Sequence, residues 1–326
     1  MKNIVQEVKE KIIDYDYKIN FEEALSLYSF SDADQLFSAA NEIRKTKCSG
    51  KTSVCSVINA KQGMCGEDCI YCAQSCRWKT SCKVTPLIAA DEAVEKCKLA
   101  LQCGVHRLSL VTAGRGLCGK DFLQILECFK EISKRCPGLK TCASLGIISY
   151  SQMLDLKACG VVRYHHNLET SRQFFPNVCK THSWQERMDT LLAARKAGLE
   201  LCCGGIIGLG ESREDRVSLA FDLLSLKPES IPLNILSPIK GTPLENAKAL
   251  CKEEILRTIA VFRFILPDST LRIAAGRKSL GENGRDAFLC GANALISGDL
   301  LTIPGSTNED DIAMLRELGF TPTYDV

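Results

Sequence analysis

Three cysteines lie close together in the run CGEDCIYC, and their spacing carries the strongest chemical signal in the chain. Cys65, Cys69 and Cys72 follow the pattern C-x3-C-x2-C on a short glycine-bearing segment. Three thiolates on one loop suit three corners of a cubic iron–sulfur cluster, and they leave the fourth iron without a protein ligand. An iron with an open position can do chemistry, whereas a closed four-cysteine site mostly transfers electrons or supports a fold. The spacing therefore favours a reactive cluster.

Zinc is the alternative for the same segment. Cys69 and Cys72 alone form a CxxC pair of the kind that holds zinc or exchanges thiols. Cys76 and Cys82 lie near enough in the sequence to complete a four-thiolate zinc site. On spacing alone, a structural zinc or incidental cysteines stay open beside the three-thiolate cluster.

A glycine-rich segment, GGIIGLGE, offers a surface to a flat ligand. It runs from Gly204 through Ile206 and Gly208 to Glu211, at the end of a strand-like run and the start of a helical one. Glycines let the backbone approach a ligand closely, and the carboxylate stands near a helix N-terminus. Most such segments are only strand-to-helix turns, so the pattern alone is weak.

The run RYHHNLETS places polar side chains on one face of a predicted strand. His165, Asn167 and Glu169 share that face, because successive strand residues point to opposite sides. An amide and a carboxylate two residues apart at a strand end can hold the two hydroxyls of a ribose. The alternative is a polar strand end whose groups are satisfied by local hydrogen bonds.

Composition bounds the class of protein. The chain has 326 residues, a net charge of +2 and 25% charged residues, so nothing points to a nucleic-acid or acidic-membrane partner. The N-terminal run MKNIVQEVKEKIIDYDYK has no apolar core, and no stretch approaches the ~20 apolar residues of a membrane span. We therefore expect a cytoplasmic protein. Its 19 cysteines are then reduced, mostly small buried hydrophobes, and their number suggests a cell with little oxygen.

The periodicity of apolar residues predicts which elements position these groups. Residues 1–50 show helical periodicity, and strands then alternate with helices. Predicted strands cover 52–60, 106–112, 140–146, 161–168, 199–207, 230–236, 270–275 and 293–297. Predicted helices cover 89–103, 119–135, 149–159, 183–197, 211–226, 251–265, 281–290 and 308–318. Eight βα units close a (β/α)8 TIM barrel of the α/β class rather than an open sheet.

We expect a helical extension over residues 1–50 and one barrel domain over residues 51–326. In such a barrel the working site lies at the C-terminal ends of the strands. The cysteine run follows the first strand and so falls in the first βα loop, on that face. This placement agrees with a reactive cluster.

The cysteine run resembles the radical S-adenosylmethionine superfamily, in which the open iron binds the methionine part of the cofactor. Tyr71 matches that superfamily's adenine-contacting aromatic position, although an ordinary packed loop aromatic is the alternative. The segment from Gly204 to Glu211 is similar to the superfamily's GxIxGxxE pattern, whose backbone contacts the adenine. Five segments together resemble the biotin synthase family, from about residue 50 to past residue 305: CGEDCIYCAQS, YHHNLETS, CCGGIIGLGES, LNILSPIKGTPL and LRIAAGR.

The family resemblance implies a role for each matched residue around the first cluster. Cys65, Cys69 and Cys72 match the ligands of the 4Fe–4S cluster that cleaves S-adenosylmethionine. Asn167 and Glu169 match the Asn and Asp that hold the cofactor's ribose, with Glu for Asp a modest change.

The resemblance also implies dethiobiotin as the substrate, with sulfur inserted between its C6 and C9. Asn234 matches an asparagine that binds the ureido ring. The family's other ureido-binding asparagine falls at His165, a departure that leaves the details of substrate binding open. Histidine can still donate and accept hydrogen bonds.

A second cluster is implied deep in the barrel, where the best-known family members hold a sulfur-donating 2Fe–2S cluster with three cysteines and an arginine. Those positions fall at Ser109, Cys142, Cys202 and Arg272. A serine hydroxyl is a poor ligand for a soft iron–sulfide site. The ligand from the second strand is therefore missing.

Cys55, on the neighbouring first strand, is a candidate replacement. It shares its strand face with Val57 and Asn59, and a buried cysteine without a metal is the alternative. Cys203 falls on the opposite face from Cys202 and is expected to pack against helices. Three thiolates around a wider triangle favour a 4Fe–4S-type cluster with an open or sulfide-bearing iron, and a rearranged 2Fe–2S cluster stays open.

The sequence thus predicts a radical sulfurtransferase of the biotin synthase family. Its expected partners are a flavodoxin or ferredoxin as electron donor, the iron–sulfur assembly machinery and a second copy in a homodimer. The nearest alternative is a related barrel enzyme such as a hydrogenase maturase or a methylornithine synthase. A zinc-stabilised barrel that binds a small ligand is the alternative from another class.

Overall fold

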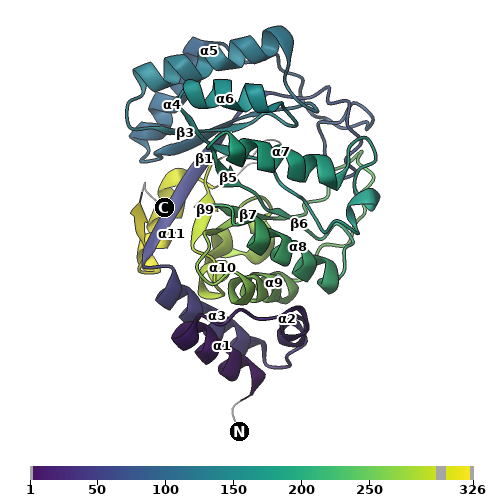
Figure 1. The fold of residues 1–326 in the computed structure, drawn as a ribbon, viewed down its shortest axis with the longest axis vertical. Helices are drawn as coiled ribbons and strands as arrows, with labels where there is room; N and C mark the ends of the chain where they lie inside the picture. The colour runs from purple at the N-terminus through teal and green to yellow at the C-terminus, as the bar shows by residue number, and fades with distance from the viewer. Residues whose placement is uncertain (1–2, 299–305, 324–326) are drawn as a thin grey trace.

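The computed structural model describes residues 3–298 and 306–323 and arranges most of them as a barrel of parallel strands covered by helices (Figure 1). No helix in this described part is long and apolar enough to cross a membrane. The end of the predicted barrel domain, residues 324–326, lies outside the described residues. The strands are β1 (Lys51–Lys61), β2 (Arg107–Thr112), β3 (Lys140–Ser144), β4 (Val161–His165), β5 (Glu200–Cys202), β6 (Gly205–Ile207), β7 (Ile231–Ile235), β8 (Leu271–Ile273), β9 (Ala294–Ile296) and β10 (Thr321–Thr323).

The strands are ordered β5-β4-β3-β2-β1-β9-β8-β7-β6. The two ends of this path, β5 and β6, are consecutive parts of the single strand predicted over 199–207, so the path closes on itself with eight strand positions. Parallel bridges from Glu169 to Gly205 and from Cys202 to Ser230 span the junction. The predicted (β/α)8 barrel is confirmed, and the short β10 adds a parallel partner to the start of β1.

The fifth strand is interrupted because its backbone changes partners at Gly204. Before this residue, β5 pairs with β4, and after it, β6 pairs with β7. A Cβ atom on Gly204 would stand 1.9 Å from the Pro232 carbonyl oxygen, so only glycine fits between these strands. The prediction of one continuous strand over 199–207 is corrected to two short strands with this break between them.

The barrel helices follow the predicted periodicity. They are α4 (Ala90–Gln102), α5 (Gly119–Arg135), α6 (Tyr150–Ala158), α7 (Trp184–Lys196), α8 (Arg213–Leu226), α9 (Lys252–Ile265), α10 (Arg285–Leu289) and α11 (Asn308–Glu317). Ser149, Ser183 and Ser212 begin α6, α7 and α8 with reciprocal capping boxes, which satisfy the free amides of the first turn. The helix predicted over 281–290 is shorter, because Gly281 and Gly284 have positive φ angles of 69° and 82°, and short 3-10 turns precede α10.

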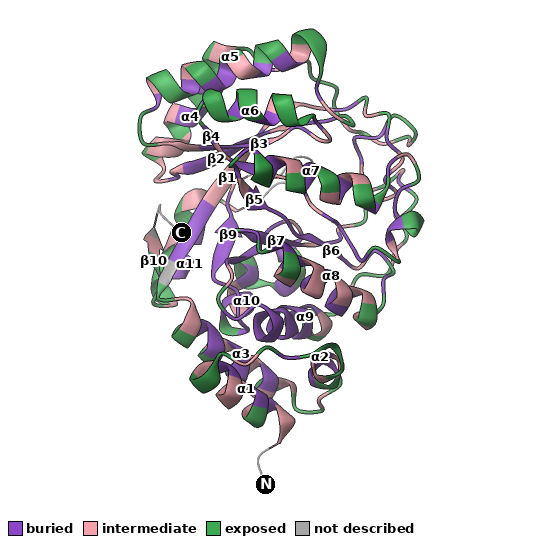
Figure 2. Ribbon diagram, viewed as in Figure 1, coloured by how far each residue is buried: buried purple, intermediate pink, exposed green. Residues whose placement is uncertain are grey.

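Three N-terminal helices cover one side of the barrel. α1 (Ile4–Tyr15), α2 (Phe21–Tyr28) and α3 (Ala33–Lys47) lie below α9 in Figure 1. Every residue of α9 from Ile255 to Ile265 is buried, and Figure 2 shows this helix buried along its length, whereas the outer faces of α5 and α6 are exposed. A helix buried on every side needs neighbours on every side, and the N-terminal extension supplies them on one side of α9.

Candidate active site

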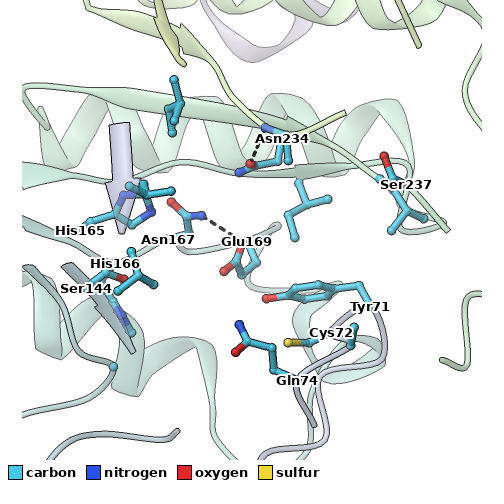
Figure 3. A pocket seen from close by; sticks show the side chains of 18 of the residues that line it. Tyr71, Cys72, Gln74, Ser144, His165, His166, Asn167, Glu169, Asn234 and Ser237 are labelled. Carbon is cyan, nitrogen blue, oxygen red and sulfur yellow. Dashed lines mark hydrogen bonds between the residues drawn. The ribbon is translucent and has the colours of Figure 1, made fainter. Parts of the chain in front are cut away.

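A cavity of about 340 Å³ lies at the C-terminal ends of the strands. The first βα loop and the ends of several strands line it (Figure 3). In the figure Glu169 lies between Asn167 and the end of the cavity formed by Tyr71 and Cys72. Seven of the predicted site residues share this wall: Tyr71, Cys72, His165, Asn167, Glu169, Ile206 and Asn234.

The loop after β1 folds back on itself around its three cysteines. The Cys65 amide donates to the Gln74 carbonyl at 2.9 Å, and the Cys76 amide donates to the Cys65 carbonyl at 2.8 Å. The Trp78 indole donates to the Cys69 carbonyl at 3.1 Å. Burial raises the pKa of the Cys65 thiol and raises that of Cys72 to about 11, so these sulfurs stay protonated until a metal displaces the protons.

A second loop, residues 178–182, holds the cysteine loop in place. The Ile70 amide donates to the Val178 carbonyl at 3.0 Å. The Asp68 carboxylate accepts from the amides of Lys180 and Thr181 at 2.9 and 3.1 Å. These bonds lower the pKa of Asp68 against the opposing effect of its burial. The clamp fixes the middle of the cysteine loop from outside the cavity.

Sequence reasoning missed the residues that form this clamp. The Cys179 sulfur lies 3.2 Å from His182 Nδ1, and His182 Nδ1 lies 2.5 Å from a Glu67 carboxylate oxygen. The ligand atoms of Cys69, Cys179 and His182 all lie within 4.8 Å of one another. The C-x2-H spacing of CKTH was the signal in the sequence that could have drawn attention to this loop.

Arg187 connects the clamp to the predicted ribose site. Its Nε donates to His182 Nε2 at 3.0 Å, and its Nη1 donates to the Asn167 carbonyl at 2.7 Å. Its Nη1 also lies 3.4 Å from a Glu169 oxygen. The Asn167 amide donates to the other Glu169 oxygen at 3.3 Å. The amide and carboxylate predicted to bind a ribose therefore lie side by side on the cavity wall.

The glycine-rich segment contributes less of its length to the cavity than predicted. In the described structure Ile206 lines the cavity, whereas Gly204, Gly208 and Glu211 are not among its lining residues. Glu211 is buried and accepts from the Gly208 amide at 2.8 Å and from Arg216 Nε at 2.6 Å. It therefore fixes the turn that follows Ile206.

Asn234 and His165 stand at the other side of the cavity. The Asn234 side chain donates to the Gly205 carbonyl and accepts from the Ala275 amide, each at 3.1 Å. These bonds leave one amide hydrogen and one oxygen lone pair for a ligand. His165 lines this cavity and also a smaller cavity that adjoins it.

The smaller cavity lies inside the barrel and has a volume of about 20 Å³. Ser109 lines it together with the four predicted residues of the second cluster, which are Cys55, Cys142, Cys202 and Arg272. Val57, His165 and Ile296 line both cavities, so the two adjoin. Cys203 instead belongs to the buried hydrophobic core, on the helix side as predicted.

Positive charge surrounds the cysteines of the interior cavity. Burial would raise the pKa of Cys202, but the charge and hydrogen bond of His165 and the nearby Arg163 and Arg272 lower it to about 6. His165 and Cys202 are directly paired residues of β4 and β5. The Arg272 guanidinium already donates to the Ser230 hydroxyl, the Ser53 carbonyl and hydroxyl, and the Leu295 carbonyl. It is therefore held firmly at the wall.

Comparison with known proteins places this geometry in a family. The pattern of the Radical SAM superfamily matches residues 61–223, and that of the Biotin and Thiamin Synthesis associated domain matches residues 232–321. The chain is 48% identical over 324 residues to the biotin synthase of Clostridium tetani, covering 98% of this chain and 99% of the relative. It is 43% identical to the biotin synthase of Fusobacterium nucleatum, covering 98% and 91%. The chain belongs to the biotin synthase family.

Membership of the biotin synthase family confirms the predicted reaction class, a radical S-adenosylmethionine sulfurtransferase, and implies a 4Fe–4S cluster with that cofactor. Solved structures share the fold at lower identity. Methylornithine synthase aligns with a TM-score of 0.82 at 19% identity, covering 97% of each chain. The FeFe-hydrogenase maturase of Carboxydothermus hydrogenoformans aligns with a TM-score of 0.84 at 15% identity, covering 99% of this chain and 80% of that one.

The first donor set fits the cluster that the biotin synthase family implies. Three thiols lie on one hydrogen-bonded loop, and Cys72 faces the cavity. Among the described residues, one group of cysteine, histidine and carboxylate atoms is close enough to hold a single ion, and it is Cys69, Cys179 and His182. Cys76 is exposed and Cys82 stands outside that group. The exposure of Cys76 favours the three-thiolate set over the four-thiolate zinc site considered from the sequence.

The second donor set also fits an iron–sulfur group. Three cysteines, an arginine and two side-chain atoms with no hydrogen-bond partner among the described residues, Ser109 Oγ and Arg107 Nε, surround the interior cavity. Cys55, Cys142 and Cys202 would hold such a group as thiolates, around a cavity of about 20 Å³.

Proposed function

We propose that this chain makes biotin from dethiobiotin. The cavity of about 340 Å³ at the strand ends, called the upper cavity, is the radical site, and the interior cavity of about 20 Å³ is the source of sulfur. One observation supports this most strongly. The cavity that holds Cys72, Asn167 and Glu169 adjoins the one lined by Cys55, Cys142 and Cys202, and His165 lines both. A substrate in the upper cavity thus lies between a radical generator and a thiolate-rich site.

The first set of residues would bind and orient the cofactor. Bound at Cys65, Cys69 and Cys72, a 4Fe–4S cluster with S-adenosylmethionine supplies a 5′-deoxyadenosyl radical, and a second cluster supplies sulfur. Asn167 and Glu169 hold the ribose hydroxyls, while Tyr71 and the backbone about Ile206 contact the adenine. Arg187 holds Glu169 and the Asn167 carbonyl in position.

Gly204, Gly208 and Glu211 would fix the backbone of the glycine-rich segment that contains Ile206. Glu211 anchors the Gly208 amide and so fixes the backbone against which the adenine rests. Gly204 admits the close approach of the Pro232 carbonyl. These three residues therefore position the adenine surface and need not contact it.

Dethiobiotin would lie between Asn234 and His165. Asn234 is held by its bonds to Gly205 and Ala275, so its free hydrogen and lone pair are pre-oriented toward the ureido ring. His165, paired with Cys202 across β4 and β5, places the other end of the ring above the interior cavity. The apolar residues Val57 and Ile296 at the junction of the two cavities exclude water there.

Cys55, Cys142 and Cys202, with Arg272 beside them, are the proposed ligand set of the second cluster. Three thiolates from three strands favour a 4Fe–4S-type cluster with an open or sulfide-bearing iron over a 2Fe–2S cluster. Electrons would come from a flavodoxin or ferredoxin and clusters from the iron–sulfur assembly machinery. A homodimer is the expected assembly.

The decisive experiment is anaerobic turnover with both sites loaded. Protein with verified iron and sulfide content, incubated with dethiobiotin, S-adenosylmethionine and a strong reductant, should form biotin. Cleavage of S-adenosylmethionine without any biotin would instead favour a reaction like those of the hydrogenase maturases or methylornithine synthase.

A substitution at Asn234 tests the substrate site. Asn234→Ala should weaken dethiobiotin binding by ~1–3 kcal/mol, because a hydrogen-bonding partner on the cavity wall is lost. Titration of the loaded protein with dethiobiotin measures this change. Ser237→Ala, on the same cavity wall, is the control, and equal affinities of the two variants would contradict the assignment.

A further inference from the structure

The cysteine loop after β1 presents apolar side chains to solvent as well as to the upper cavity. Its segment 71–74 lines the cavity. Away from that lining, Met64 and Val84 are 70% and 62% exposed. An antiparallel bridge joins Gln62 to Thr85, with amide-to-carbonyl distances of 3.3 and 3.0 Å, so the two exposed side chains stand on adjoining segments. Exposed apolar residues that gather within a polar rim mark a binding surface.

The rim of this surface is positively charged. Arg77, Lys79 and Lys83 are all exposed, and the stretch from residue 70 to residue 90 contains no Asp or Glu. No ion pair among the described residues includes any of these three side chains. Their charges are therefore free to attract a negatively charged partner.

The carboxylates on the adjoining segments already have partners. Glu67 is buried, and Asp68 accepts from two backbone amides of the clamp. The loop that packs against the Lys79 carbonyl carries Glu245, whose carboxylate accepts from the Gly241 amide at 2.7 Å. The surface thus keeps its positive charge.

Hydrogen bonds attach this surface to the backbone around the first cluster's cysteines. Arg77 Nε donates to the Gly66 carbonyl at 3.0 Å. The Trp78 indole donates to the Cys69 carbonyl at 3.1 Å. Electron transfer falls steeply with distance, so a redox partner needs to approach the cluster closely. A protein seated here would be separated from the cluster by the cysteine loop alone.

We propose that Met64 and Val84, ringed by Arg77, Lys79 and Lys83, form the docking surface for a small acidic protein that carries single electrons. The inference rests on the proposed function and adds the place at which the reductant binds. In each encounter the carrier's reduced cofactor loses one electron and the first cluster gains it. Redox encounters use small interfaces, and complementary charge mainly speeds and orients them.

Binding of an acidic flavodoxin tests the surface without relying on turnover. The cluster-loaded protein is titrated anaerobically with oxidised flavodoxin in a calorimeter. The double variant Lys79→Glu/Lys83→Glu should raise Kd roughly tenfold or more at about 50 mM salt, because two attractions become repulsions. At about 500 mM salt the difference should shrink, since exposed charges are then screened.

Lys18→Glu/Lys45→Glu is the matched control. Both lysines are exposed in the N-terminal extension, and the variant has the same change in net charge. It should bind flavodoxin like the wild type.

The source of electrons provides a second readout. Cleavage of S-adenosylmethionine driven by reduced flavodoxin should slow in the Lys79→Glu/Lys83→Glu variant. Cleavage driven by dithionite should be unchanged, because a small reductant needs no docking surface. A loss of dithionite-driven cleavage would show that the substitutions damage the cluster site, and it would reject the proposal.

Three further results would also overturn the proposal. They are no binding of flavodoxin to the wild type, equal Kd values for the two double variants, and a change of oligomeric state in Lys79→Glu/Lys83→Glu, which would assign the surface to a second copy of the chain. Biotin assayed in the dithionite samples separates this inference from the proposed function. Biotin formation with equal Kd values rejects the docking surface alone. Selective loss of flavodoxin binding without any biotin supports the surface and rejects the proposed reaction.

Discussion

Glu169 carries its carboxylate on a backbone conformation that few side-chain-bearing residues adopt. Its φ angle is 70°, a left-handed conformation that costs of order 1–3 kcal/mol outside glycine and persists where the surroundings fix it. The Glu169 amide donates to the Gly204 carbonyl at 3.2 Å, and the Ile206 amide donates to the Glu169 carbonyl at 2.8 Å. The break in the fifth strand therefore determines where the carboxylate stands.

The three cysteines of the first loop should be individually essential. Changing Cys65, Cys69 or Cys72 to Ala removes one corner ligand of the proposed cluster, so 5′-deoxyadenosine formation under reducing conditions should be abolished in each variant. Chromatography of the nucleoside products measures this. Cys76→Ala, at an exposed cysteine of the same loop, is the control, and an undiminished rate in all three variants would end the radical assignment.

Cys55 should be needed for sulfur insertion and not for radical formation. Cys55→Ser removes one proposed ligand of the second cluster, so iron per chain should fall by about four for a cubic cluster or about two for a rhombic one. Cleavage of S-adenosylmethionine should continue. Cys203→Ser, on the helix side of the adjoining strand position, should keep its iron. Full iron and biotin formation in Cys55→Ser would show that another residue is the ligand.

At the scale of single elements, the fifth strand position depends on Gly204. A Cβ atom there would stand 1.9 Å from the Pro232 oxygen and 2.8 Å from its carbonyl carbon, so Gly204→Ala must push two backbones apart. Overpacking of this kind costs ~1–3 kcal/mol. Chemical unfolding of the apoprotein measures the loss. Gly50→Ala, where a Cβ meets nothing within 4 Å, is the control, and equal stabilities would show that the strands relax freely.

The periodicity of the sequence predicted the positions of the strands and helices better than it predicted the contacts among them. Strand and helix positions follow from alternation and helical spacing, which are local properties of the chain. The break at Gly204 was not predictable, because it depends on the Pro232 carbonyl of the next strand. Cys179 and His182 were missed for a similar reason, since a loop without periodicity meets the cysteine loop only when both are folded. Arg187 lies in the predicted helix α7, but helical periodicity does not show that its side chain reaches His182.

The site residues also divide into those that local sequence patterns place and those that depend on contacts in the folded chain. Asn234 falls on the cavity wall because strand parity and the barrel face fix it, whereas Asn167 and Glu169 lie beyond the end of β4 and reach the wall through their hydrogen bonds to Gly204. Glu211 does not, since its carboxylate turns inward to Arg216 at 2.6 Å. A motif match indicates that a residue belongs to a segment, but its direction depends on its partners.

At the scale of the whole molecule, the N-terminal helices that stabilise the fold lie apart from the residues that line the two site cavities. The N-terminal helices pack on α9, on the barrel's outer side, and several contacts link them. Arg257 Nη1 donates to the Phe30 carbonyl at 2.6 Å, and the Tyr28 hydroxyl meets Thr258. The extension thus completes the burial of α9, and from Asn3 onward it supplies none of the residues that line the two site cavities.

A core substitution in this extension should therefore reduce stability alone. Leu36, in α3, is fully buried, so Leu36→Ala should lower the free energy of unfolding by ~2–5 kcal/mol. Denaturant titration measures this. The same substitution at Leu99, which is 60% exposed on α4, should change it by less than about 0.5 kcal/mol. A loss of iron per folded chain in Leu36→Ala would contradict the separation.

The bond from Trp78 to the Cys69 carbonyl gives the chain an optical reporter of its own. The chain has two tryptophans, and the other, Trp184, donates to the Thr170 carbonyl at 3.2 Å. An iron–sulfur centre held by this loop would absorb broadly and could quench the emission of an indole bonded to the loop. Ultraviolet emission from Trp78 should be dark in the loaded protein and brighten as iron leaves, so damage by oxygen can be followed in real time without any added dye.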